Sequence, residues 1–175
     1  VLHGGAEKVF GYEYLAGSHL LHRLTKPNGM TLTQSYESQR NLLTDMAYHR
    51  GTTLVAQREY TYDTLGRPTV RNTSRQGTVK NDSFGYNNRS ELTSATVSGS
   101  NYAYAYDNIG NRTAAVEDSS GVASRTEYTA NELNQYTAVG DFTPTFDADG
   151  NQTLVKTSTG TWSVTYDAEN RPVSF

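Results

Sequence analysis

Residues 104–112 read YAYDNIGNR, and residues 60–68 read YTYDTLGRP. Each stretch begins with aromatic residues at every second position, which places the aromatic side chains on one face of a β-strand. Each then continues with Asp, two variable residues, Gly and a polar residue. An Asp side chain can accept backbone N–H groups in a tight turn, and Gly adopts the positive φ that such turns need. Both stretches therefore predict a strand that ends in a defined turn.

The same pattern recurs along the chain. Clear copies are FGYNNR (84–89), TEYTANELN (126–134), TFDADGN (145–151) and VTYDAENRP (164–172), and weaker copies are YEY (12–14) and YESQRN (36–41). Successive copies start 18 to 26 residues apart when measured between their main aromatic residues. This step is too short for repeats made of helix pairs. The aromatic residues used for this measurement are Tyr14, Tyr36, Tyr62, Tyr86, Tyr106, Tyr128, Phe146 and Tyr166.

Further turn signals lie between the copies, for example Asn28-Gly29, Gln76-Gly77 and Ser120-Gly121. Strands should therefore reverse at both ends, so that one repeat is one antiparallel hairpin. A lone hairpin is marginally stable in water, so each hairpin must pair with the next. The predicted fold class is all-β: tandem antiparallel β-hairpin repeats that form a curved or spiral sheet.

Composition excludes several classes of protein. The formal net charge is −3 and no run of either sign occurs, so the sequence carries no footprint of a nucleic-acid-binding or membrane-surface protein. Cysteine is absent, which excludes disulfides and thiolate metal sites. Apolar clusters are far shorter than a membrane span. The N-terminus lacks the features of a signal peptide, so we expect an export signal to lie outside this sequence and both ends to be cuts through a longer protein.

The pattern Tyr-x-Tyr-Asp-x-x-Gly-Asn/Arg of residues 60–67 and 104–111 resembles the YD repeats of the Rhs (rearrangement hotspot) family. That family includes bacterial Rhs toxins, the C components of insecticidal Tc toxins and the extracellular part of teneurins. The resemblance covers nearly the whole chain, and it implies that the hairpins form part of a hollow β-sheet shell that typically encloses a toxin. The self-cleaving segment of the family is marked by an Asp-Pro pair, and no such pair occurs here.

We therefore expect a single array of about eight repeats over residues 1–175, divergent in 1–50 and clear in 51–175, cut from a larger protein. So few repeats should form an open sheet with exposed edges that associate with flanking repeats or with other copies. The residues expected to carry the fold are the ladder aromatics and turn residues. They are Tyr14, Tyr36, Tyr62, Asp63, Gly66, Tyr86, Tyr106, Asp107, Gly110, Tyr128, Asn131, Phe146, Asp147, Gly150, Trp162, Tyr166 and Asp167.

Three chemical alternatives have weaker support. His19 and His22 have a spacing seen in some metal sites but lack a third ligand. Asp147 and Asp149 resemble part of a calcium loop, but the later bidentate Glu is missing. The recurring Asp residues could suggest paired carboxylates of a hydrolase, yet one Asp per repeat at a strand end is typical of a turn cap. We therefore predict no catalytic, cofactor-binding or metal-binding residue and no cofactor.

The predicted function is a structural one: a segment of shell wall in an exported toxin carrier, secreted or at the cell surface, with the flanking repeats and a C-terminal toxin as partners. The alternative is a carbohydrate-binding module, because tyrosine rings stack on sugars and cell-wall-binding repeats have a similar length. Trp162 is the only Trp, whereas such modules usually rely on several. An unexpected site would be sought at residues 19–23 and 48–50, where the repeat pattern is weakest.

Overall fold

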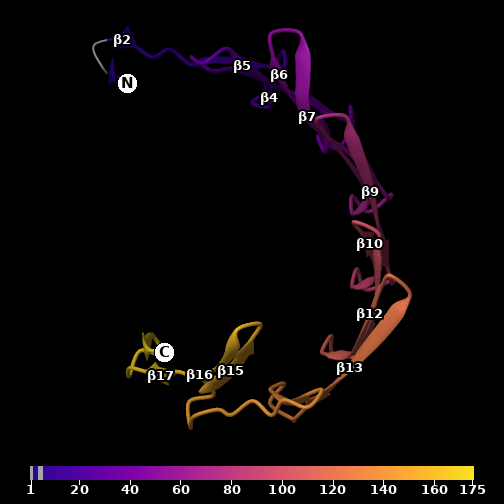
Figure 1. Ribbon diagram of the computed structural model, residues 1–175, viewed down its shortest axis with the longest axis vertical. Helices are drawn as coiled ribbons and strands as arrows, with labels where there is room; N and C mark the ends of the chain where they lie inside the picture. The colour runs from indigo at the N-terminus through magenta and orange to yellow at the C-terminus, as the bar shows by residue number, and fades with distance from the viewer. Residues whose placement is uncertain (1, 4–5) are drawn as a thin grey trace. The chain divides into compact units, whose positions relative to one another are not determined.

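The computed structural model describes residues 2–3 and 6–175, and within them it contains strands and turns but no helix. The described residues therefore include no helix that is long and apolar enough to cross a membrane. Twelve strands form one open antiparallel sheet in sequence order, and three further hairpins have two strands each (Figure 1). The predicted all-β class built from antiparallel hairpins is confirmed.

The strands of the large sheet are short to medium in length. They are β3 (Gly11–Tyr14), β4 (Leu21–Thr25), β5 (Met30–Tyr36), β6 (Leu43–Arg50), β7 (Thr53–Tyr62), β8 (Pro68–Arg75), β9 (Thr78–Tyr86), β10 (Leu92–Val97), β11 (Ser100–Tyr106), β12 (Arg112–Ser119), β13 (Val122–Ala130) and β14 (Tyr136–Val139). The two-stranded hairpins are β1 (Leu2–His3) with β2 (Ala6–Glu7), β15 (Leu154–Thr157) with β16 (Gly160–Ser163), and β17 (Thr165–Tyr166) with β18 (Pro172–Ser174).

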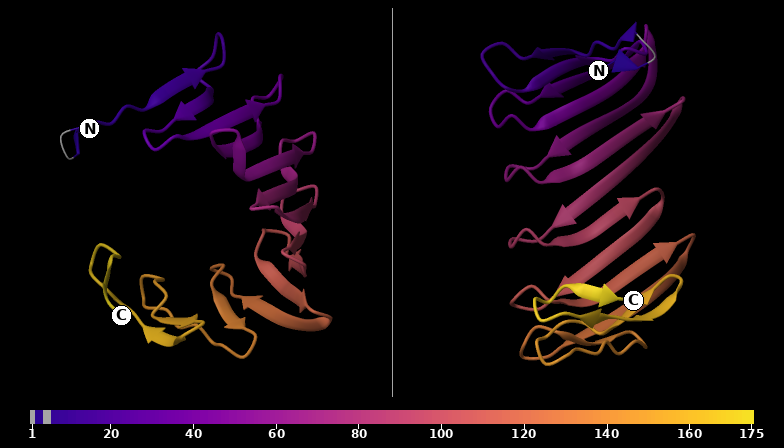
Figure 2. Two further views of the ribbon diagram at one scale, coloured as in Figure 1. Left: turned by 45° about the horizontal axis from the view of Figure 1, so that its top comes forward. Right: turned by 90° about the vertical axis from the view of Figure 1, so that its left-hand side faces the viewer.

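The chain divides into two compact units, one ending at Ser100 and the other beginning at Asn101. In the first unit, each strand from β3 to β10 pairs with the next in sequence, and the strands lie side by side across the sheet (Figure 2). In the second unit, β11 to β14 pair in the same way, and the hairpins β15–β16 and β17–β18 follow. Local turns thus account for the whole topology.

The sheet is a single layer with little core. Among the described residues, only five hydrophobic side chains are buried: Leu32, Ala47, Ala95, Ala114 and Val164. None of the described side chains is completely removed from solvent. Because no second layer covers the strands, stability must come mainly from the backbone ladder and from contacts between side chains on neighbouring strands.

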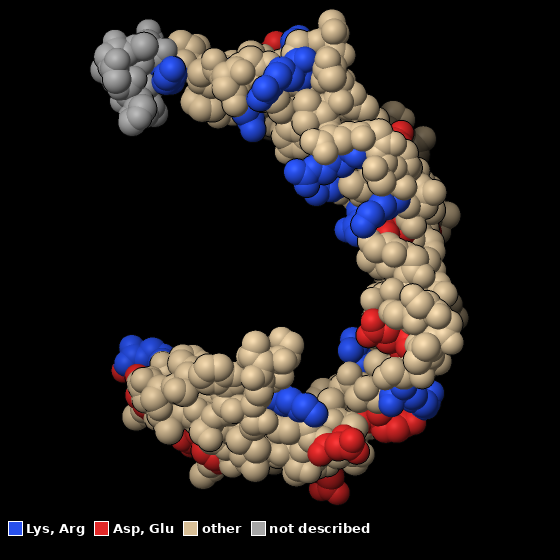
Figure 3. Space-filling view, viewed as in Figure 1, with Lys and Arg blue, Asp and Glu red and all other residues tan. Residues whose placement is uncertain are grey.

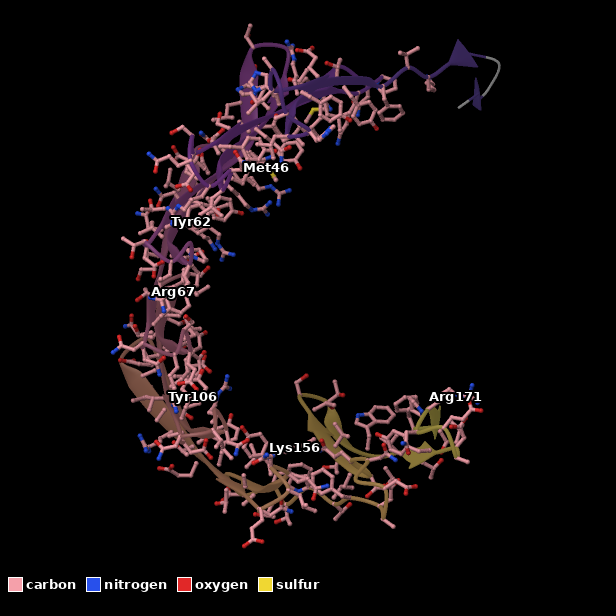
Figure 4. The ribbon with its side chains drawn as sticks, turned by 180° about the vertical axis from the view of Figure 1, so that it is seen from behind. Met46, Tyr62, Arg67, Tyr106, Lys156 and Arg171 are labelled. Carbon is pink, nitrogen blue, oxygen red and sulfur yellow. The ribbon has the colours of Figure 1, made fainter. Side chains whose placement is uncertain are left out.

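The pairing register of the first unit separates the aromatic side chains from the small polar ones. Tyr60 lies opposite Arg71, and Leu32 lies opposite Tyr48. The face that carries these aromatic side chains is called the tyrosine face of the first unit. Met46 and Tyr62 project from it (Figure 4). The opposite face carries mainly Thr, Ser and Asn. The aromatic residues on the tyrosine face are Tyr12, Tyr14, Tyr36, Tyr48, Tyr60, Tyr62, Phe84 and Tyr86.

Candidate functional site: the repeat turns

The turn that follows Tyr62 shows what the repeat motif does. The backbone N–H of Asp63 donates to the carbonyl of Arg67, and the N–H of Gly66 donates to the carbonyl of Asp63 (both 3.0 Å). Asp63 Oδ1 accepts the N–H groups of Leu65 (2.9 Å) and Arg67 (3.0 Å). Gly66 has a φ of +80°, which closes the turn and is costly for a residue with a Cβ atom. One carboxylate thus organises a five-residue turn.

Five later turns have the same geometry, and we call all six the repeat turns. In each, an Asp or Asn at the first position accepts the backbone N–H groups of the third and fifth residues at 2.9 to 3.1 Å. The fourth residue always has a positive φ. The first and fourth residues of these turns are Asn87 and Ser90, Asp107 and Gly110, Asn131 and Asn134, Asp147 and Gly150, and Asp167 and Asn170.

The two upstream turns depart from this plan. They are one residue longer: Leu15 and Glu37 donate their N–H groups to the carbonyls of Leu20 and Leu42. Neither begins with Asp or Asn, so the short side chain that caps the other turns is missing. In the second of them, Arg40 instead binds the Glu37 carboxylate at 2.6 Å.

In three of the repeat turns, the fifth residue connects that turn to the next one. Arg67 donates through Nε to Asp63 Oδ2 (2.6 Å) and through Nη1 to the carbonyl of Asn87 (2.9 Å) and the hydroxyl of Ser90 (3.2 Å). Arg67 lies at the turn end of its hairpin (Figure 4). Asn111 binds Asn134 (3.2 Å) and Asn151 binds Asn170 (2.8 Å) in the same way. Arg40, the fourth residue of the longer turn before Asp63, donates to the Asp63 carbonyl (2.8 Å). This bridging role was not predicted from the sequence, although the Arg or Asn after Gly is visible in the motif.

Four tyrosines that directly precede a turn fasten their hairpin to the preceding one. Tyr62 donates its hydroxyl to the carbonyl of Leu43 (2.7 Å), the residue at which the strand after the preceding turn begins. Three other tyrosines make the same bond: Tyr36 to Leu21 (2.9 Å), Tyr86 to Pro68 (3.0 Å) and Tyr166 to Gln152 (2.9 Å). Burial raises the pKa of Tyr62 above its usual value, and the nearby Tyr60 and Glu37 add to this effect. The ladder of tyrosines is therefore also a ladder of hydrogen bonds.

The repeat around residue 130 has its aromatic residue in a different position from the other repeats. The residue directly before this turn is Ala130, whereas Tyr128 lies two positions earlier. Tyr136, just after the turn, places its hydroxyl where it accepts the backbone N–H of Arg112 (2.8 Å). Its ring packs edge-on against Tyr128 at a centroid distance of 5.4 Å. A phenol from the other strand of the hairpin thus makes the contact that Ala130 cannot.

Three other predicted ladder residues lack the tyrosine bond. Phe146 has no hydroxyl and forms an isolated bridge with Gln152. Trp162 lies in the β15–β16 hairpin opposite Val155 and donates its Nε1 to the Thr157 hydroxyl (3.1 Å). Tyr14 is 56% exposed and precedes one of the two longer turns. These residues share the aromatic character of the ladder without its hydrogen bond.

The turn carboxylates are held in their ionised form. The pKa of Asp107 and that of Asp147 lie below the usual value, chiefly because the Asn111 and Asn151 side chains donate to them. Arg171 lowers the pKa of Asp167 in the same way. Partial burial acts to raise the pKa of Asp63, but hydrogen bonds from Arg67 and Leu65 outweigh it, so this pKa is lowered too. These carboxylates act as acceptors for their own turns.

Comparison with known proteins agrees with this geometry. The family model of the teneurin YD-shell matches residues 10–173. The chain belongs to the teneurin YD-shell family. Among curated protein sequences, none is similar enough to count as a relative.

Solved structures of Tc toxins resemble this YD-shell chain. In the complex TcdB2-TccC3-Cdc42, the match has a TM-score of 0.81 at 17% identity and covers 98% of this chain and 10% of the other. TcdB2-TccC3 alone gives 0.80 at 18% identity, covering 98% and 10%. The Photorhabdus luminescens Tc holotoxin pore gives 0.67 at 17% identity, covering 94% and 11%. The YD-shell chain thus has their fold and spans about a tenth of their length.

The residues considered for other chemistry occupy ordinary places in the YD-shell fold. His19 lies in the turn after β3, and His22 places Nδ1 3.1 Å from the carbonyl of Gln34. Asp147 is engaged with Asn151 and with the Asp149 backbone. Within residues 2–3 and 6–175, no group of three or more His, Cys, Asp or Glu side chains is placed to hold a metal ion.

Proposed function

We propose that this chain is a segment of the wall of a larger shell protein and performs no catalysis of its own. The observation that carries the proposal is the bonding between successive repeat turns, as in the contact of Arg67 with the Asn87 turn and those of Asn111 and Asn151 with the turns that follow them. A single layer held together by equivalent contacts between neighbours can be extended by adding repeats, as in other repeat proteins. Such a layer can separate the space on one side of the wall from the space on the other. The acidic side chains of the repeat turns accept hydrogen bonds from their own turns, which is a structural role.

We also propose that the parent protein is exported, either secreted or displayed at the cell surface, and carries a toxin after its shell. One similar solved structure is described as TcdB2-TccC3 without its hypervariable C-terminal region, so that protein has a variable region at its C-terminal end. The flanking repeats would be the immediate partners of this chain. The outer strands β3 and β14 of the sheet offer unpaired backbone groups, which favour pairing with a further strand.

Protease protection of the parent protein tests the enclosing role. The polypeptide that follows the shell should resist cleavage in the intact parent and become sensitive when residues 60–103, which hold two repeats, are deleted. A parent that carries a short insertion in the exposed turn at Gln76-Gly77 is the matched control and should stay protected. Equal cleavage of the intact parent and the deletion variant would contradict enclosure.

Glycan binding by the tyrosine ladder is the less supported alternative. The hydroxyl groups of Tyr36, Tyr62 and Tyr86 are donated to backbone carbonyls, so they are committed to the sheet. Their rings are half-buried. In a sugar-binding ladder, the tyrosines would offer an exposed ring face for stacking and free hydroxyl groups for hydrogen bonds to the sugar.

A further inference from the structure

The first unit separates its charges between the two faces of the sheet. On the strands from β3 to β10, the face opposite the tyrosines carries Glu13, Asp45, Glu59 and one cation, Arg23. The tyrosine face carries one carboxylate, Asp82. Lys and Arg atoms gather along one side of this unit (Figure 3). The strand cations on the tyrosine face are Arg50, Arg58, Arg71, Arg75 and Lys80, and the turn residues Lys26 and Arg67 lie over the rings of Tyr48 and Tyr86.

Four of these cations surround one residue, Thr73. Arg58 on β7 and Lys80 on β9 lie directly opposite Thr73 in the two neighbouring strands. Arg71 and Arg75 lie two residues before and after it on β8, on the same face. Neighbouring strands are about 4.8 Å apart, and same-face residues along a strand are about 6.7 Å apart. The four cations therefore form one compact cluster, although they are spread over 23 residues of sequence.

Only one member of this cluster is neutralised by the fold. Arg71 binds the carboxylate of the buried Asp82 at 2.6 Å, and the backbone N–H of Ser98 donates to the other oxygen of Asp82 (3.0 Å). Lys80 reaches only the hydroxyl of Ser98, at 3.4 Å. Across the described part of the chain, no carboxylate lies within 4.0 Å of Arg58, Arg75 or Lys80. Arg58, Arg75 and Lys80 thus form no ion pair within the described residues, although Asp82 attracts Lys80 at longer range.

We propose that Arg58, Arg75 and Lys80, grouped around Thr73, bind the carboxylates of an extended acidic stretch of polypeptide. The inference rests on the proposed shell role, because a wall meets a second polypeptide on one of its faces. Alternate side chains of an extended peptide are about 6.7 Å apart, which matches the spacing within the cluster. Arginine binds carboxylates through paired N–H groups. The Thr73 hydroxyl can donate a further hydrogen bond.

The surroundings of the cluster favour a peptide over a nucleic acid. Met46 lies opposite Arg58, Tyr60 lies opposite Arg71, and Ala56 lies opposite Arg75. These apolar and aromatic neighbours suit the mixed side chains of a polypeptide. A protein that makes six to ten phosphate contacts uses about two to three times as many cations as the three that lack an ion pair here. The formal net charge of −3 also opposes the approach of a polyanion from a distance.

The test is a binding titration of the full chain with a labelled peptide of alternating Glu and Ser, read by fluorescence anisotropy at low salt. The same peptide with Gln in place of Glu, and a single-stranded oligothymidylate of equal charge, are the comparison ligands. We expect the Glu peptide to bind tightest and its binding to weaken as salt is raised. Tighter binding of the oligothymidylate, or equal binding of the Glu and Gln peptides, would overturn the proposal.

Substitutions locate the binding. The triple variant R58Q/R75Q/K80Q should bind the Glu peptide at least about tenfold more weakly, and R75Q alone should show part of that loss. R23Q is the matched control, because it removes an exposed strand cation from the opposite face, and its affinity should stay within about twofold. An equal loss of affinity for the Glu peptide in R23Q and R75Q would refute binding at the cluster. A chain that fails to bind the peptide but still assembles through its edges would refute this site and leave the shell role standing.

Discussion

The hydroxyl of Tyr62 donates a hydrogen bond to the backbone carbonyl of Leu43, which lies nineteen residues earlier in the chain. The bond joins the end of one hairpin to the start of the strand that follows the preceding turn. Few side chains of the described residues are buried. Hydrogen bonds between hairpins therefore contribute a larger share of the stability than they would in a protein with a deep core.

Tyr62→Phe should therefore destabilise the chain by about 1 kcal/mol, since it leaves the Leu43 carbonyl without its donor and keeps the ring. The quantity to measure is the free energy of unfolding in urea. Tyr60→Phe is the matched control: Tyr60 lies on the same face and stacks on Tyr62, but its hydroxyl makes no hydrogen bond within the described residues. Equal effects of the two substitutions would argue against the hydroxyl ladder.

Gly66→Ala should destabilise the chain by about 1 to 2 kcal/mol. Its φ of +80° is unfavourable for a residue with a Cβ atom, which would also lie 3.4 Å from Leu42 Cδ1. Asn41 also has a positive φ, +58°, and lies in an exposed turn. The opposite kind of substitution, Asn41→Gly, should leave the stability of the chain unchanged or raise it slightly. The melting temperatures of both variants test these two expectations. A G66A protein as stable as the original chain would mean that the turn adopts another conformation.

Stability should fall in acid because of the turn carboxylates. The pKa values of Asp63, Asp107, Asp147 and Asp167 are lowered in the folded chain. A lowered folded-state pKa gives stability that is present above the unfolded value of about 3.9 and is lost as pH falls through the folded value. The melting temperature should therefore drop steeply below about pH 4.

Asp107→Asn separates charge from turn geometry. The Asn side chain keeps the oxygen that accepts the Ile109 and Asn111 amides, as Asn87 and Asn131 do in their own turns. The variant should lose part of the acid-dependent change in melting temperature while still folding. An unchanged pH profile in this variant would show that Asp107 does not contribute to the acid transition.

Arg67→Ala should loosen two turns at once. Arg67 binds Asp63 in its own turn and Asn87 and Ser90 in the next. Hydrogen exchange of the Gly66 and Ser90 amides, which close these two turns, should become faster. Arg23→Ala, on the opposite face of β4, is the control and should leave both rates unchanged. Faster exchange at Gly66 alone would mean that Arg67 does not couple the turns.

The sequence was sufficient to predict the features that depend on neighbouring residues. The strand that leads to Tyr106 and the turn closed by Asp107 and Gly110 follow from alternation and turn chemistry within nine residues. Bonds between turns, such as that from Arg67 to Ser90, depend on the register of hairpins 23 residues apart, which no local signal specifies. The contact between Tyr136 and Arg112 was not predicted, because spacing along the chain does not show which aromatic residue reaches the neighbouring hairpin.

The basic cluster around Thr73 was also invisible in the linear sequence. Arg58, Arg75 and Lys80 are separated by polar residues, so no run of charge appears. Antiparallel pairing brings them onto one face, because directly opposed residues point to the same side of the sheet. Only the register of three strands reveals the patch.

Light scattering with size-exclusion chromatography tests the central claim, that the chain is a wall segment which needs its neighbours. The isolated chain and the chain extended by the flanking repeats on both sides should be compared at equal concentration. We predict that the isolated chain associates through its open edges and that the extended protein does not. A stable monomer in both forms would contradict the account and indicate a self-contained module.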